Sequence, residues 1–120
     1  MNKAIYTLGK QIVEAIEKKK VISVEALNVH SLTPLADVFI IAVASNVRQA
    51  QAMADEVEEL LEAEGHLPIH KEGYQSATWI LLDYGQVIVH ILEEESAQFY
   101  GLSRLWKDAT MINYKENEDV

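Results

Sequence analysis

The sequence predicts a small α/β domain in which helices flank a mixed sheet of about five strands. Two long segments, 2–19 and 46–64, carry apolar residues at the spacing of an amphipathic helix. Apolar, β-branched runs at 38–44 and within 79–92 are typical of strands. A strand followed by a helix and another strand favours a parallel crossover, whereas the last two strands are close enough to form an antiparallel hairpin. Together these observations predict one sheet that contains both kinds of pairing.

The first predicted helix spans residues 2–19. Its apolar stripe consists of Ile5, Leu8, Ile12, Ala15 and Ile16. The three lysines at 18–20 suit the negative end of the helix dipole, which is an ordinary structural role. Residues 21–29 alternate imperfectly and predict a strand, and the turn at 30–35 contains a proline as breaker.

The middle of the chain predicts a strand, a helix and a short third strand. Residues 38–44 are apolar at every position, as expected for a central strand that is covered on both faces. Asn46 and Gln49 form a capping-box pattern at the start of the second helix, and Gly65 ends it. The buried stripe of this helix is predicted to be Ala50, Met53, Val57, Leu60 and Leu61. Residues 67–71 predict a third strand, at an edge because it contains a proline.

The hairpin predicted within 79–92 is the most informative segment. A tight turn at Tyr84 and Gly85 places Trp79 opposite His90. Alternation then gives one mixed face that carries Trp79, Leu81, Asp83, Ile88 and His90. The other face is purely aliphatic and consists of Ile80, Leu82, Val87, Val89 and Ile91. We expect the aliphatic face to lie in the core, while the mixed face suits contact with another macromolecule.

The end of the chain predicts short helices and a tail. Residues 96–100 form a short helical stretch that Gly101 ends. Helical spacing recurs after it in Leu102, Leu105 and Trp106. The domain is therefore expected to span residues 1–112, with an acidic and flexible tail at 113–120.

Composition bounds the possible functions. The 120 residues fit one domain, and the absence of cysteine excludes disulfide scaffolds, thiol catalysis and zinc sites built on sulfur. The net charge of −9 disfavours direct binding to nucleic acid and matches a basic protein partner, although solubility alone is an equally simple explanation. The longest apolar run, 38–44, is far shorter than the ~20 residues of a membrane helix. Since the N-terminus also lacks the pattern of a signal peptide, we expect a cytoplasmic protein.

Patterns of catalysis or metal binding are not found. His66 and His70 are four residues apart, but on a strand their α-carbons would be about 13 Å apart, too far to share one ion. The five glycines are too scattered for a phosphate-binding loop. Among the carboxylates, Asp37 and Asp83 lie at strand ends, where aspartate most often accepts hydrogen bonds from local backbone N–H groups. We therefore expect no catalytic residue, no metal and no cofactor.

The aromatic residues leave two interpretations open. His90 is either a half-buried imidazole that packs on an aromatic ring or a contact residue at an interface. Trp79 favours an interface, because its strand already offers an aliphatic face to the core. Trp106 slightly favours the core, since it recurs with leucines at helical spacing.

Three ordered motifs carry a family resemblance. The first is DVFII at 37–41 with SNVRQ at 45–49. The second is EG at 72–73 with WILLDYG at 79–85 and VIVH at 87–90. The third is YGLSRLWKDA at 100–109. Together they resemble the signatures of the ribosomal silencing factor family, also called the Iojap family, over almost the whole domain.

The resemblance implies more than composition shows. Members of this family bind the large ribosomal subunit through its fourteenth protein, on the face that meets the small subunit, and they lower translation by blocking subunit joining. The family fold is a mixed sheet related to nucleotidyltransferases without their catalytic carboxylates, and homodimers are common. This chain has Glu94 and Ala97 where the family often has proline and arginine, and Ser103 where it usually has glutamate. These departures remove local ion pairs and bring contacts in that segment into question.

The resulting hypothesis is a translation repressor that acts by steric block. The residues predicted to bind the partner are Trp79, Leu81, Asp83, Tyr84, His90 and Tyr100. Within this set, Asp83 would pair with a basic side chain. Two alternatives remain: a degenerate nucleotidyltransferase-like enzyme, and a homodimeric adaptor that uses the same face on a second copy.

Overall fold

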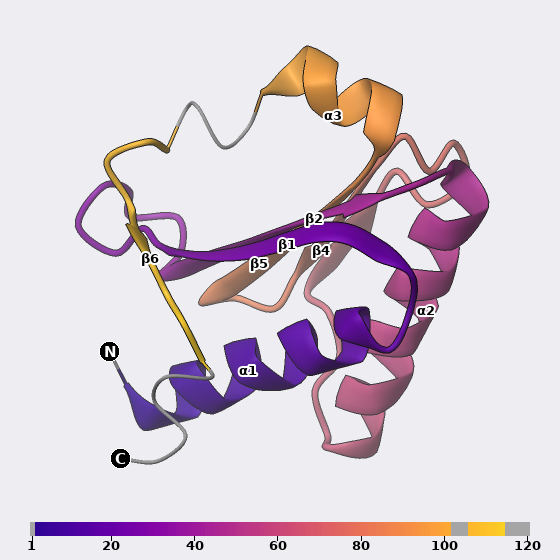
Figure 1. Cartoon of the computed structure of the whole chain (residues 1–120). Coiled ribbons are helices and arrows are strands. Elements are labelled where there is room, and N and C mark those ends of the chain that lie inside the picture. Colours follow the sequence, from indigo (N-terminus) through magenta and orange to yellow (C-terminus); the bar gives the residue numbers. More distant parts are fainter. Residues whose placement is uncertain (1, 102–105, 115–120) are drawn as a thin grey trace.

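The computed structural model describes residues 2–101 and 106–114, without the side chains of 98–100. In this part of the chain a six-stranded mixed sheet has the strand order β3-β4-β5-β2-β1-β6. The elements are α1 (Lys3–Glu17), β1 (Val21–Asn28), β2 (Val38–Ala44), α2 (Val47–Ala63), β3 (His70–Glu72), β4 (Trp79–Asp83), β5 (Val87–Glu93), α3 (Glu94–Tyr100) and β6 (Thr110–Met111). Helices α1 and α2 lie on one side of the sheet and α3 lies on the other (Figure 1). The predicted α/β class is confirmed, with one strand more than expected.

The helix boundaries follow from the capping residues. The side chain of Asn2 accepts a hydrogen bond from the backbone N–H of Ala4 at the start of α1. Asn46 accepts one from Gln49 N at 2.9 Å at the start of α2, as its sequence pattern predicts. Gly65 follows α2 with a φ of +86°, a left-handed conformation that glycine adopts without strain.

The central strands form the only parallel pair of the described sheet. Strand β2 pairs in parallel with β5 over seven residues, from Val38 opposite Val87 to Ala44 opposite Glu93. The predicted crossover from β2 through α2 ends on β3, which pairs with β4 at an edge of the sheet. Two strands, β4 and β5, therefore lie between the start and the end of the crossover.

The hairpin of β4 and β5 has a different turn from the predicted one. Asp83 lies opposite Ile88 and Leu81 opposite His90, so the pairing is shifted by two residues and Trp79 lies opposite Leu92. Tyr84 continues the ladder by donating its N–H to the carbonyl of Val87, and the turn passes through Gly85 and Gln86. Because a shift of two residues preserves alternation, the predicted assignment of the two faces is still correct.

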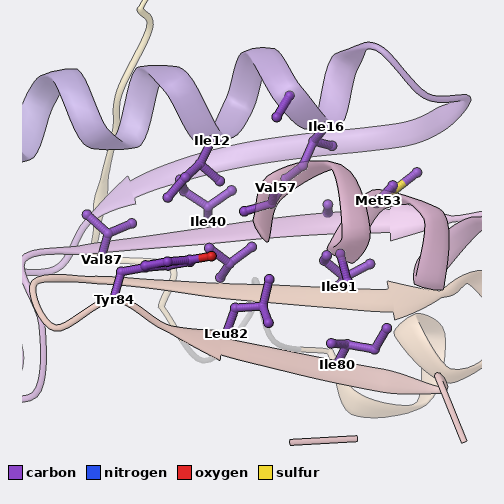
Figure 2. Close-up of a cluster of buried hydrophobic side chains, with 14 of the residues drawn as sticks. Ile12, Ile16, Ile40, Met53, Val57, Ile80, Leu82, Tyr84, Val87 and Ile91 are labelled. Atoms are coloured by element: carbon purple, nitrogen blue, oxygen red, sulfur yellow. The ribbon is translucent and has the colours of Figure 1, made fainter. Parts of the chain in front are cut away.

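The aliphatic face of the hairpin lies in the main core. Ile80, Leu82, Val87, Val89 and Ile91 are all fully buried against α1, α2 and the central strands. Figure 2 shows Ile80, Leu82, Val87 and Ile91 on the side of the sheet that faces Ile12, Ile16, Met53 and Val57 of the two helices. A second buried cluster on the opposite face of the sheet contains Leu27, Val29, Ala36, Phe39, Ile41 and Leu92.

Strand β3 is shorter than predicted, and the described sheet has a sixth strand. Strand β3 covers only His70–Glu72, which pair with residues 81–83 of β4, and Leu67 and Ile69 before it are exposed. Strand β6 was not predicted, since two residues are too few for a periodic signal. Tyr114 is buried against α1, so the packed part of the chain extends beyond residue 112. The predicted roles of residues 102–105 and 115–120 lie outside the described residues.

Within the described chain, no helix combines the length and the apolar character required to cross a membrane.

Candidate interaction surface

The mixed face of the β4–β5 hairpin is the candidate site. Trp79, Leu81 and Asp83 of β4 and Ile88 of β5 are each partly exposed on it. The second buried cluster lies on the same side of the sheet. Trp79, Ile88 and Trp106 pack against this cluster. Trp106 packs edge-on against Phe39 with ring centroids 4.9 Å apart, which agrees with its predicted core role. The outer part of the hairpin therefore remains as a partly exposed, mainly apolar surface, with the carboxylate of Asp83 at the end of β4.

The side chain of His90 is buried beneath this surface, where it contacts Trp79. Its side chain is only 6% exposed and packs edge-on against Phe39 at 5.1 Å between ring centroids. Trp79 Nε1 donates a hydrogen bond to His90 Nδ1 at 3.1 Å, so the proton of the neutral ring lies on Nε2. Burial lowers the pKa of His90 to about 4, which keeps the imidazole neutral near pH 7. His90 therefore matches the first of its two interpretations, an imidazole that packs on an aromatic ring, although it is more deeply buried than expected, and it orients Trp79.

Asp83 has a structural role at the turn. Its Oδ1 accepts a hydrogen bond from the N–H of Gly85 at 2.7 Å, the local use expected for aspartate at this position. The side chain is nevertheless partly exposed at the end of β4. Asp83 therefore fixes the hairpin and still presents negative charge at the end of the mixed face.

Tyr84 does not extend the mixed face. Its side chain is 9% exposed and belongs to the main core on the helix side of the sheet, where Figure 2 shows its ring among Val87, Leu82 and Ile40. Burial, with a smaller effect from Glu58, raises the pKa of the phenol far above its ordinary value. Tyr100 lies in α3, but its side chain is outside the described part of the structure.

Strand β3 contributes two residues that the sequence analysis missed. His70 lies opposite Asp83 and Glu72 opposite Leu81, so alternation places both on the mixed face. Their side chains form an exposed ion pair at 3.3 Å between His70 Nε2 and Glu72 Oε2. Alternation could not identify them in advance, because a strand of three residues is too short to show a period.

A cavity lined by polar side chains lies apart from the hairpin face. It measures about 540 Å³ near the first residues of β2 and β5, and its lining includes His30, Asp37, Gln86 and Asp108. His30 Nδ1 lies 2.5 Å from Asp37 Oδ1, so the carboxylate of Asp37 is already engaged. Among the described residues no group of three potential ligands is arranged to hold a metal ion.

Comparisons of the sequence with known proteins give one consistent result. A sequence model of the family "Ribosomal silencing factor during starvation" matches residues 2–120. A ribosomal silencing factor of Halalkalibacterium halodurans is 35% identical over 100 residues, which cover 83% of this chain and 86% of that protein. A ribosomal silencing factor of Bacillus subtilis is 31% identical over 82% of this chain and 84% of its own length.

Two crystal structures have the same fold. A Chromobacterium violaceum protein superposes with a TM-score of 0.81 at 31% identity, covering 84% of each chain. A Bacillus halodurans protein superposes with a TM-score of 0.79 at 31% identity, covering 89% of this chain and 97% of that one. Similarity in both sequence and structure thus extends over most of the domain.

Proposed function

Because this chain belongs to the ribosomal silencing factor family, a family of non-enzymatic ribosome-binding factors, we propose that it represses translation by binding the large ribosomal subunit at its fourteenth protein. The bound protein sterically blocks joining of the small subunit. This activity places the protein in the cytoplasm, where ribosomes assemble on messenger RNA.

The mixed hairpin face is the observation that supports this proposal. It combines the partly exposed side chains of Trp79, Leu81 and Ile88 with a carboxylate at one end. Apolar and aromatic residues of this kind contribute most of the binding energy in protein interfaces. The bond from Trp79 to His90 fixes the indole in advance, which lowers the entropy lost on binding.

Leu81→Glu is the sharpest test of this surface. Leu81 is partly exposed on β4, whereas Trp79 is bonded to a buried histidine, so a substitution at Trp79 would also disturb the fold. A glutamate at position 81 places an unpaired charge in the centre of the contact and is expected to weaken binding by at least about tenfold. Co-sedimentation with isolated large and small subunits and with intact ribosomes measures this change.

A matched control is Leu35→Glu, which makes the same chemical change at a leucine that is 72% exposed in the loop before β2. This variant should bind like the wild type. Wild-type protein should bind the large subunit alone and reduce the yield of joined ribosomes. Unchanged binding by Leu81→Glu, at wild-type thermal stability, would show that the contact lies elsewhere. If Leu81→Glu instead converts a dimer to a monomer in sedimentation velocity and leaves ribosome binding intact, the face serves homodimerisation.

A further inference from the structure

Among the described residues, the outer edge of β1 has no partner strand along most of its length. Strand β6 pairs only with Leu27 and Asn28, at one end of β1, and one further bond joins Ile112 N to the carbonyl of Ala26 at 2.8 Å. Figure 1 shows β6 meeting a single end of β1, above α1. No strand of the described chain pairs with this edge between residues 21 and 25. An unpaired edge of this kind is a template for the addition of another strand.

Alternation identifies the backbone groups that face outward. Because the carbonyl of Ala26 accepts from Ile112, the N–H and C=O groups of Val24, two residues earlier, point to the same side. The pairing with β2 is regular over both residues, since the irregularity in register lies between Val21 and Ser23. Val24 thus offers a donor and an acceptor to an incoming strand, whose paired length the irregularity limits to a few residues.

A groove runs beside this edge. It encloses about 320 Å³ between α1 and β1, and its apolar lining includes Val13, Val24 and Ile112. Met111, which is 62% exposed, also lines the groove. Main-chain pairing at an edge combined with a pocket for alternate side chains is the arrangement that binds extended peptides.

We propose that the outer edge of β1 and this groove bind an extended segment of a partner protein in which apolar and basic side chains alternate. The charges favour a basic segment, because the lining includes the carboxylates of Glu14 and Glu17 against the single ammonium group of Lys10, and the whole chain has a net charge of −9. A second copy fits less well, since it would bring two sets of these glutamates together.

This site is independent of the proposed function. Strands β5 and β2 separate β1 from β4, so the groove and the hairpin face can be occupied at the same time. The protein would then have two protein-binding surfaces, one on a face of the sheet and one at its edge. A substitution that abolishes binding at one surface should therefore leave binding at the other surface unchanged.

Fluorescence anisotropy with a labelled octapeptide of alternating valine and lysine tests the proposal on the full chain. The wild type should bind this peptide and should not bind one of alternating valine and glutamate. Val24→Pro removes the outward N–H and keeps the ladder with β2, because proline is tolerated where the N–H faces away from the sheet. We expect this variant to bind at least about tenfold more weakly.

Charge reversal provides a second variant that does not alter the backbone. The double substitution Glu14→Lys with Glu17→Lys should also weaken binding about tenfold. Its matched control is Glu59→Lys with Glu62→Lys, which makes the same change in net charge on the exposed side of α2. Hydrogen exchange in β4 and β5 confirms that each variant is folded.

Three outcomes would overturn the proposal. The first is equal binding of the peptide by wild-type protein and folded Val24→Pro. The second is self-association of the wild type that Val24→Pro abolishes, which would identify a second copy as the occupant. The third is binding that appears only after removal of residues 115–120, which would identify the chain's own C-terminal segment as the occupant.

Discussion

At the scale of single residues, the buried pair of Trp79 and His90 links the proposed binding surface to pH. The pKa of His90 is lowered by burial from 6.5 to about 4. Between these values the unfolded chain binds a proton that the folded chain excludes, so this residue's contribution to stability is full above pH 6.5 and is lost as the pH falls toward 4. Protonation would also remove the acceptor at Nδ1 and release the indole of Trp79.

We therefore expect His90 to destabilise the protein by about 2 to 3 kcal/mol between pH 7 and pH 4.5. The free energy of unfolding in urea measures this for the wild type and for His90→Gln, which has no titrating group at this position. The wild type should lose more stability than the variant by that amount, since carboxylates and the other histidines titrate in both proteins. Equal losses in the two proteins would mean that His90 accepts a proton in the folded state at no cost.

At the scale of elements, the connection between β3 and β4 depends on the backbone of Gly73. Its φ is +79°, and a Cβ at this position would lie 2.1 Å from the carbonyl oxygen of Trp79. That oxygen belongs to the backbone of β4, so it cannot move without shifting the strand. Two hydrogen bonds of Tyr74 hold the same loop to α2. Its hydroxyl donates to Asp55, and its backbone carbonyl accepts from the side chain of Gln51.

Gly73→Ala should accordingly destabilise the fold far more than Gly65→Ala. Gly65 has a similar φ of +86° and nothing within 4 Å of the added Cβ, so it reports the cost of the left-handed backbone alone. We expect about 1 kcal/mol for Gly65→Ala and at least about 3 kcal/mol for Gly73→Ala, measured by urea unfolding. A similar cost for both substitutions would show that the loop moves away from Trp79 freely.

The hairpin shows how far the sequence alone predicted the fold and the site. Its two faces follow from alternation, so the buried positions and the partly exposed Trp79, Leu81 and Asp83 were predictable. The position of the turn was not predictable. In sequence, Tyr84 and Gly85 resemble the two turn residues, but the ring of Tyr84 is buried in the core and the N–H of Gly85 donates a hydrogen bond to the side chain of Asp83. Alternation also could not predict that His90 is buried, because it assigns a residue to one face of the sheet but does not show what covers that face.

Short elements limited prediction in the same way. Strands β3 and β6 have three and two residues, so neither shows a period, and both are fixed by pairing with a longer neighbour. The consequence for the site is that His70 and Glu72 were assigned no role, although the register places them beside Asp83 and Leu81. The family motifs gave no information on His70, because the second motif begins at Glu72.

At the scale of the whole molecule, net charge should distinguish the proposed ribosomal partner from a second copy of the chain. Each chain carries a net charge of −9 on a compact body with a radius of gyration of 13.2 Å. This charge opposes the association of two copies and favours a partner with a positively charged surface. The Debye length falls from about 10 Å at 0.1 M salt to about 3 Å at 1 M, so salt removes most of either effect.

The salt dependence of the two associations should consequently have opposite signs. Between 50 and 500 mM NaCl, binding to the isolated fourteenth protein of the large subunit should weaken by about tenfold, while self-association should become tighter. Anisotropy measures the first and sedimentation velocity the second, and sucrose at matched osmolality controls for effects other than screening. If both associations weaken with salt, dimerisation rests on local ion pairs that outweigh the net charge. If both strengthen, apolar burial on the hairpin face dominates each contact, and the charge of Asp83 has no part in choosing the partner.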